Sequence, residues 1–291
     1  MELELTLEIE LLGGLGNQLF GFAAGVAASQ RIQTDLLLNT SQLSHRGYQL
    51  SKLGISIATT DAFQIQKSKQ LEEIIWKLSL KKFSQPVKMI NEKSLFTETE
   101  KIVDKRFFNI ENNTYIRGYY QSVQYFEQYR DKITQSLSLN IQNNTQAATI
   151  RSDIGKDPWT AVHVRRGDYL DNLGVFQLTS KNYYKKAVQI IDVQSKKMNY
   201  VVFSDDIDLA KNIFPNGYLY IGPKELSVPG QILILMSCAD NLIASNSSLS
   251  WWAAYLSKMD HGLKIFPRPW FLSDLKKDSD ILLPEWISLG N

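Results

Sequence analysis

Cysteine is almost absent from this sequence, since the 291 residues contain only one, Cys238. A single cysteine excludes an internal disulfide. Cys238 lies in the apolar stretch "ILILMSCADN", where a small buried side chain is expected rather than a reactive thiol. These features are typical of a reducing compartment, and we expect a cytoplasmic protein.

An excess of charge of one sign is also lacking. Lysine and arginine total 32 while aspartate and glutamate total 30, which leaves a net charge of +2. No global electric field draws the protein to polyanions, so we exclude nucleic acid as a partner and expect at most a weak association with a membrane surface. Any anion must be bound by a local site.

Long apolar runs are missing too. The first residues, "MELELTLEIELL", have neither the basic flank nor the long apolar core of a secretion signal. No later stretch approaches the roughly 18 uninterrupted apolar residues of a transmembrane helix. We therefore expect neither a signal peptide nor a transmembrane segment.

What is present is the composition of an ordinary folded protein, with 44% hydrophobic and 21% charged residues. The length fits two medium domains better than one average core. Segment 140–158 is polar and poor in aromatic residues, and it contains a glycine and a proline near its end. We interpret it as a linker and place the boundary near residue 155, between domains 1–155 and 156–291.

Apolar periodicity predicts a mixed α/β fold. Alternating residues predict a strand from Leu3 to Leu11, followed by a glycine turn and a closely packed helix that includes residues 22–29. The first domain should also contain a strand at 34–39, a helix at 71–83, a strand from Thr114 and a helix at 123–137. In the second domain we expect strands at 159–164, 200–203, 218–221, 241–244 and 263–266, and helices at 181–193, 207–214, 231–238 and from Leu249. Such alternation favours a parallel sheet with helices on both faces and ligands at the carboxyl ends of its strands.

Polar side chains follow three of these strands. The first strand of the second domain runs into "HVRRGD", which contains His163, Arg165, Arg166 and Asp168. The segments "SDD" at 204–206 and "SNSS" at 245–248 follow two others. Because the carboxyl ends of parallel strands share one edge of a sheet, we expect these groups to form a single site.

The residue types at this edge point to a phosphorylated ligand. The serines at 245–248 come directly before a helix, where unpaired backbone N–H groups and the helix dipole favour an anion. Arg165 or Arg166 can add bidentate contacts to phosphoryl oxygens, and Asp205 can accept hydrogen bonds from a base or a ribose. Together they predict a pocket for a nucleoside diphosphate that requires no metal ion.

The same residues also have structural interpretations. Ser245 and Ser247 can simply cap the following helix, and one of the two arginines can instead pair with Asp168. Asp205 and Asp206 can either hold a metal ion or cap a helix. The turn "GGLGNQ" is weak support by itself, because it lacks the third glycine of a dinucleotide fingerprint and the lysine-serine pair of a P-loop.

Five sequence blocks follow one another along nearly the whole chain: "GGLGNQLF" (13–20), "RGYYQSVQYF" (117–126), "VHVRRGDY" (162–169), "VVFSDD" (201–206) and "SNSSLSWWAAYL" (245–256). In this order they resemble the bacterial α-1,2-fucosyltransferases of glycosyltransferase family 11. The resemblance implies a GT-B architecture, with two Rossmann-like domains facing across a cleft. It further implies transfer of L-fucose from GDP-fucose to the 2-hydroxyl of a galactose-terminated acceptor, with inversion and with neither metal ion nor other cofactor. The first domain would then face the acceptor and the second would bind the GDP-sugar.

The resemblance also implies roles for single residues. Arg165 would bind the β-phosphate and neutralise the leaving group, Asp168 would hold the arginines in place, and Asn17 would lie near the fucose or the acceptor. These three are the expected catalytic residues, and Gln18 is a second candidate beside Asn17. The expected donor-binding residues are Gly14, His163, Arg165, Arg166, Asp205, Ser245, Asn246, Ser247 and Ser248. Among them, His163 and Asp205 would lie beside the nucleoside, and the last two serines would contact the pyrophosphate.

Two other functions fit the same residues. One is a transferase of this architecture that uses another nucleotide sugar or another acceptor. The other is a non-catalytic protein that binds a nucleotide sugar or a carbohydrate. The sequence names no general base and no acceptor glycan, because acceptor contacts come from loops that no spacing rule decodes.

Overall fold

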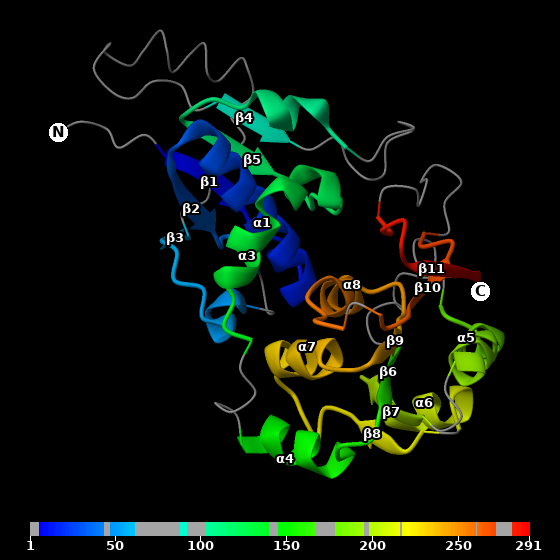
Figure 1. Ribbon diagram of the computed structural model, residues 1–291. Coiled ribbons are helices and arrows are strands. Elements are labelled where there is room, and N and C mark those ends of the chain that lie inside the picture. The colour runs from blue at the N-terminus through cyan, green and yellow to red at the C-terminus, as the bar shows by residue number, and fades with distance from the viewer. Residues whose placement is uncertain are drawn as a thin grey trace, which may run out of the picture.

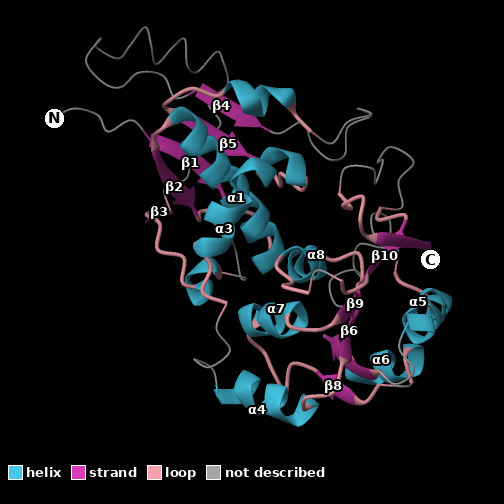
Figure 2. Cartoon of the chain, viewed as in Figure 1, coloured by secondary structure: helices cyan, strands magenta, loops and turns pink. Residues whose placement is uncertain are grey.

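The computed structural model has a mixed α/β fold built around two parallel β-sheets (Figure 1). It describes residues 6–43, 47–61, 88–91, 103–139, 145–166, 178–194, 198–215, 217–259, 261–271 and 281–291. Figure 2 shows the strands in two separate groups with helices around both. The expected fold class is therefore confirmed. Within the described ranges, none of the helices combines the length and the apolar content of a membrane-spanning segment.

In the described part of the chain, the first sheet has the parallel strand order β3-β2-β1-β5-β4. Its strands are β1 (Thr6–Glu10), β2 (Asp35–Asn39), β3 (Thr59–Thr60), β4 (Lys88–Asn91) and β5 (Thr114–Arg117). Helix α1 (Leu15–Ile32) covers one face of this sheet, and Leu7 and Ile9 are buried in the core that it shares with β1. The alternation of the first strand thus buries its apolar residues, as predicted. Two short 3₁₀ helices, η2 (Leu50–Leu53) and η3 (Lys105–Asn109), lie in the connections.

The second sheet has the parallel order β11-β10-β9-β6-β7-β8 over the described residues. Its strands are β6 (Trp159–Val164), β7 (Asn199–Ser204), β8 (Leu219–Ile221), β9 (Asn241–Ile243), β10 (Lys264–Arg268) and β11 (Ile287–Gly290). The helices of this half are α4 (Thr145–Ile154), α5 (Lys181–Gln194), α6 (Ile207–Ile213), α7 (Pro229–Ser237) and α8 (Ser248–Tyr255). The regular alternation predicted from the sequence is confirmed.

The central strand β6 is buried along its whole length because both faces of its sheet are covered. Val162 and Val164 point into a core formed with α5 and α6. Ala161, on the opposite face, belongs to the core that contains α7 and α8. A strand covered on both sides is mostly apolar; in β6 the exceptions are the buried residues Thr160 and His163, of which His163 lies near the carboxyl end.

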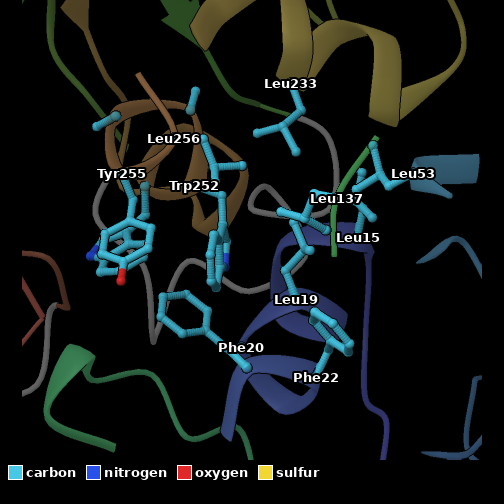
Figure 3. Close-up of a cluster of buried hydrophobic side chains, with 14 of the residues drawn as sticks. Leu15, Leu19, Phe20, Phe22, Leu53, Leu137, Leu233, Trp252, Tyr255 and Leu256 are labelled. Atoms are coloured by element: carbon cyan, nitrogen blue, oxygen red, sulfur yellow. The ribbon is translucent and has the colours of Figure 1, made fainter. Parts of the chain in front are cut away.

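The two sheets are joined by an apolar and aromatic cluster between α1 and α8. Phe20 of α1 lies 4.6 Å from Trp251 and 5.2 Å from Trp252, measured between ring centroids. Figure 3 shows Phe20 beside Trp252 and Tyr255, and Leu19 among leucines from other elements. One contiguous core therefore contains residues of both halves.

One predicted helix is interrupted. Residues 123–137, which we predicted as one helix, form η4 (Val123–Tyr125), η5 (Glu127–Tyr129) and α3 (Arg130–Gln135). Phe126 leaves the helical region with φ −140° and ψ −2°, and its ring stacks on Trp252 at 5.7 Å. Packing against the other half of the molecule thus overrides local helix propensity.

Within the predicted linker 140–158, the described residues 145–158 are more ordered than we expect of a linker. They contain α4, whose Ala147, Ile150 and Ile154 are buried and recur at helical spacing. Helix α1 also begins earlier than expected, at Leu15 inside the glycine motif. The predicted helix at 71–83 lies outside the described residues, and the domain boundary near residue 155 stays a prediction.

Candidate functional site

The candidate site lies at the carboxyl edge of the second sheet, where β6 runs between β7 and β9. His163 and Val164 end β6, Ser204 ends β7, and Ser245 is the second residue after β9. Since all three strands are parallel, their polar ends lie side by side. The structure therefore brings the three predicted groups to one edge.

His163 links β6 to the first turn of α8. Its Nδ1 contacts the hydroxyl of Ser250 and lies 3.2 Å from the hydroxyl of Ser245. Burial, together with the nearby positive charge of Arg165, lowers the pKa of His163 to about 3. The imidazole is therefore neutral at physiological pH.

Asp205 orients the two residues that follow β6. Its Oδ2 lies 2.6 Å from Nη1 of Arg165, and its Oδ1 accepts a hydrogen bond of 2.9 Å from the backbone N–H of Arg166. The side chain of Arg165 remains 27% exposed. Both oxygens of Asp205 thus hold the Arg165–Arg166 turn, and its predicted contact to a nucleoside stays a prediction.

The two arginines point to different partners. Arg166 is buried, and its Nη2 donates a hydrogen bond of 2.6 Å to the carbonyl of Thr179. Burial lowers the pKa of Arg166, partly offset by the negative charges of Asp205 and Asp206. Two neighbouring guanidiniums repel each other, and separate partners relieve that repulsion. Arg165 is consequently the more accessible of the two, and a phosphate contact by Arg166 stays a prediction.

The serine-rich segment before α8 has several distinct roles. Ser247 is the N-cap, and its Oγ accepts a hydrogen bond of 3.3 Å from the N–H of Leu249, which confirms the capping interpretation for this residue. Ser245 instead contacts His163, and Asn246 donates from Nδ2 to the carbonyl of Trp270 at 3.1 Å. Ser248 is half-buried at the first position of the helix.

The glycine motif of the first half meets α8 directly. Gly13 has a φ of +65°, which glycine adopts without strain, and Gly14 is the N-cap of α1. A Cβ on Gly16 would lie 2.5 Å from the carbonyl carbon of Ser248 and 2.6 Å from the nitrogen of Leu249. Gly16 is therefore required for close contact between two helix N-termini rather than for the turn that we expected.

Asn17 and Gln18 differ in their accessibility. Asn17 is half-buried, and its Oδ1 accepts a hydrogen bond of 2.8 Å from Nε2 of Gln121. Gln18 is fully buried: its Nε2 donates to the carbonyls of Gly13 and Gly47, each at 3.0 Å, and its Oε1 accepts from the N–H of Gln49 at 2.9 Å. Gln18 thus links the loop at residues 47–49 to the glycine turn by hydrogen bonds.

Asp206 and Asp168 are the remaining predicted site residues. Asp206 caps α6, because its Oδ1 accepts a hydrogen bond of 3.0 Å from the N–H of Leu209. Asp168 lies outside the described residues. Among the residues that the structure describes, no group of three or more histidine, cysteine, aspartate or glutamate side chains is arranged to hold a metal ion.

Sequence reasoning assigned no role to Ser250, Thr179 or Gln121. Ser250 stands five residues after Ser245 in the same motif, but the spacing alone does not indicate that its side chain faces a histidine on another strand. Gln121 belongs to the block "RGYYQSVQYF", which supported the family resemblance although no function was assigned to its residues. Ser250 and Gln121 bind residues 87 and 104 positions away, and Thr179 accepts from Arg166 through its backbone carbonyl, which no side-chain pattern indicates.

Comparisons with known proteins agree with this arrangement. The sequence pattern of glycosyl transferase family 11 matches residues 3–290. The chain is 28% identical to the O-antigen biosynthesis glycosyltransferase WbnK of Escherichia coli, over 96% of this chain and 99% of that protein. It is also 28% identical to an alpha-1,2-colitosyltransferase of Escherichia coli, over 96% of this chain and 97% of that protein.

Solved structures share the fold. The fucosyltransferase NodZ from Bradyrhizobium has a TM-score of 0.50 and 11% identity, over 86% of this chain and 93% of that one. A glycosyl transferase of family 9 from Veillonella parvula has a TM-score of 0.54 and 9% identity, over 100% of this chain and 88% of that one. The expected GT-B-like architecture is confirmed. Since the family pattern covers nearly the whole sequence, this chain belongs to glycosyl transferase family 11.

Proposed function

We propose that this glycosyltransferase moves L-fucose from GDP-fucose to the 2-hydroxyl of a terminal galactoside, with inversion and without a metal ion. In a single displacement, the acceptor oxygen bonds to C1 of fucose while the bond between C1 and the β-phosphate oxygen breaks. The acceptor hydroxyl loses its proton to a base, and GDP leaves with the negative charge. The main task of the site is to stabilise that charge.

We assign this task to Arg165 and the first turn of α8. The guanidinium of Arg165 is directed by Asp205 and is partly exposed, so it is both oriented and accessible to an anion. His163 ties the same strand end to α8, whose N-terminus favours negative charge. Single donors aimed at a developing oxyanion are worth about 3 kcal/mol each, so the two together supply several kcal/mol. Asn17 and Asp168 complete the proposed catalytic set.

The observation that carries this proposal is the meeting of three motifs. Hydrogen bonds join His163 on β6 to Ser245 and Ser250, and Gly16 of α1 touches Ser248. The end of β6 that precedes Arg165, the N-terminus of α8 and the start of α1 are therefore neighbours. A glycoside hydrolase would instead need two carboxylates on either side of the bond.

The test is an assay with GDP-fucose and lactose in the presence of EDTA, which follows both free GDP and fucosylated product. We expect transfer by the wild-type chain. Transfer should be lost in Arg165→Ala, because this variant lacks the positive charge that stabilises the departing diphosphate. Arg151→Ala is the matched control, since it removes a half-buried arginine of α4 that donates to the carbonyl of Gly155. Near-normal turnover by Arg165→Ala would refute the assignment, and wild-type protein that binds GDP-fucose yet releases neither product would indicate a binding protein.

A second candidate donor is GDP-colitose, favoured by the similarity to an alpha-1,2-colitosyltransferase over nearly the full length of both chains. Colitose is fucose without its 3-hydroxyl, so the two donors present the same diphosphate and the same C1. Parallel assays with both donors decide between them by the ratio of kcat/KM values.

A further inference from the structure

Gln121 stands in the loop that follows β5, close to the start of α1. Strands β5 and β1 are paired in parallel, so the loops after them emerge at the same edge of the first sheet. Across this edge, Nε2 of Gln121 donates to Oδ1 of Asn17 at 2.8 Å. Residues 104 positions apart are thus joined beside the candidate site.

The backbone that carries Gln121 is held in an unfavourable conformation. Tyr120 is fully buried and has a φ of +49°, a region that bulky side chains rarely adopt and that costs roughly 1 to 3 kcal/mol. Its ring packs against Phe107 at 5.2 Å and Tyr125 at 5.1 Å, and its carbonyl accepts a hydrogen bond of 2.9 Å from the N–H of Ser122. These contacts fix the loop, so the side chain of Gln121 starts from a defined position.

The hydrogen bond from Gln121 has Oδ1 of Asn17 as its acceptor. With Oδ1 occupied by Gln121, the NH₂ end of Asn17 points over the glycine turn, where a Cβ on Gly13 would lie 2.7 Å from Nδ2. An asparagine amide can rotate by half a turn with little change in shape, which would exchange its donor and acceptor ends. Only the orientation in which Gln121 binds Oδ1 leaves the N–H groups of Asn17 available to an oxygen of another molecule.

We propose that Gln121 is a positioning residue that fixes the amide of Asn17 with its NH₂ group directed to an oxygen of the reacting sugars. This inference rests on the proposed function, in which Asn17 lies near the fucose or the acceptor. Gln121 itself does not contact substrate. Its contribution to the reaction passes entirely through Asn17.

A double-mutant cycle tests the inference. Gln121→Met keeps the length of the side chain but cannot donate, and we expect kcat/KM to fall about tenfold, the loss of roughly one hydrogen bond. In the Asn17→Ala background the same substitution should change kcat/KM less than twofold, because no amide remains to be oriented. A structural disturbance of the loop would instead reduce activity in both backgrounds and would overturn the proposal.

Two further measurements complete the test. Gln124→Met is the control, since Gln124 is exposed in the same segment, and it should leave kcat/KM unchanged. The side-chain amide signal of Asn17, followed by NMR after selective ¹⁵N-asparagine labelling, should shift in Gln121→Met. An unshifted signal refutes this inference alone, whereas absence of fucosyl transfer by wild-type protein refutes the proposed function.

Discussion

His163 illustrates how burial changes the role of a residue. A histidine at the end of a central strand suggests proton transfer, since its ordinary pKa lies near neutrality. Here burial lowers the pKa to about 3, so the imidazole is a poor base at the pH where the enzyme would work. Its contacts to Ser245 and Ser250 indicate that it positions α8 instead. The base for the acceptor hydroxyl must therefore be another group.

The lowered pKa of His163 predicts how stability depends on pH. The unfolded chain binds a proton at this histidine below about pH 6.5, whereas the folded chain does not until about pH 3. The free energy of unfolding should therefore fall as the pH falls from 6.5 toward 3, by at most about 1.4 kcal/mol per pH unit from this group. Urea unfolding at pH 7, 6 and 5 measures the slope.

In that series His163→Gln should show a smaller decrease in stability on acidification than wild-type protein. His261→Gln, which removes an exposed histidine, is the control. Equal slopes for the two variants would show that His163 becomes protonated in the folded chain and that our assignment of a neutral, buried imidazole is wrong.

The contact between α1 and α8 depends on a residue without a side chain. Both helices begin where Gly16 touches Ser248 and Leu249, so two positive helix ends lie close together. That arrangement is electrostatically unfavourable until an anion is present, which is consistent with a diphosphate ligand. The structural requirement at this contact is therefore the small size of one residue.

Gly16→Ala should separate the two helices, because its Cβ would meet backbone atoms 2.5 to 2.6 Å away. Overpacking of this kind costs about 1 to 3 kcal/mol, and we also expect transferase activity to fall at least tenfold. Gly21→Ala is the matched control in the same helix, since its Cβ would meet the tip of Leu11 at 3.2 Å and a backbone oxygen of Glu10 at an ordinary 3.9 Å, and alanine favours helix. Thermal unfolding and the transfer assay should distinguish the two variants, and equal behaviour would contradict this account.

The two halves of the molecule share one core rather than meeting at a thin interface. Phe20, Trp251 and Trp252 form its aromatic part, and Glu127 accepts a hydrogen bond of 2.7 Å from the hydroxyl of Tyr255 at its edge. Contacts of this kind couple the unfolding of the sheets that they join. The molecule should consequently unfold as one unit despite its two sheets.

Calorimetry tests this expectation with Phe20→Ala. Deleting a buried aromatic ring costs about 3 to 5 kcal/mol, and the variant should still show a single transition at a lower temperature. Phe108→Ala, at a ring that is 38% exposed, should have a much smaller effect. Two separate transitions, of which only one shifts, would show that the halves unfold independently.

Local sequence signals were sufficient for most elements. The alternation in β1 and the mostly apolar run of β6 predicted strands because the spacing of apolar residues reflects which faces are covered. They were insufficient for residues 123–137, where the position of Phe126 against Trp252 breaks the helix. Helix α4 was missed because its few buried residues are separated by polar ones.

The sequence by itself determined which polar residues lie at the carboxyl edge of the second sheet, because strand periodicity and parallel topology depend on neighbours along the chain. Only the tertiary structure decided what each residue does there: Arg165 pairs with Asp205, Arg166 turns to Thr179, and Gln121 holds Asn17. Each of these choices depends on a partner outside the residue's own motif, which the fold brings close. No pattern within a single motif contains that information.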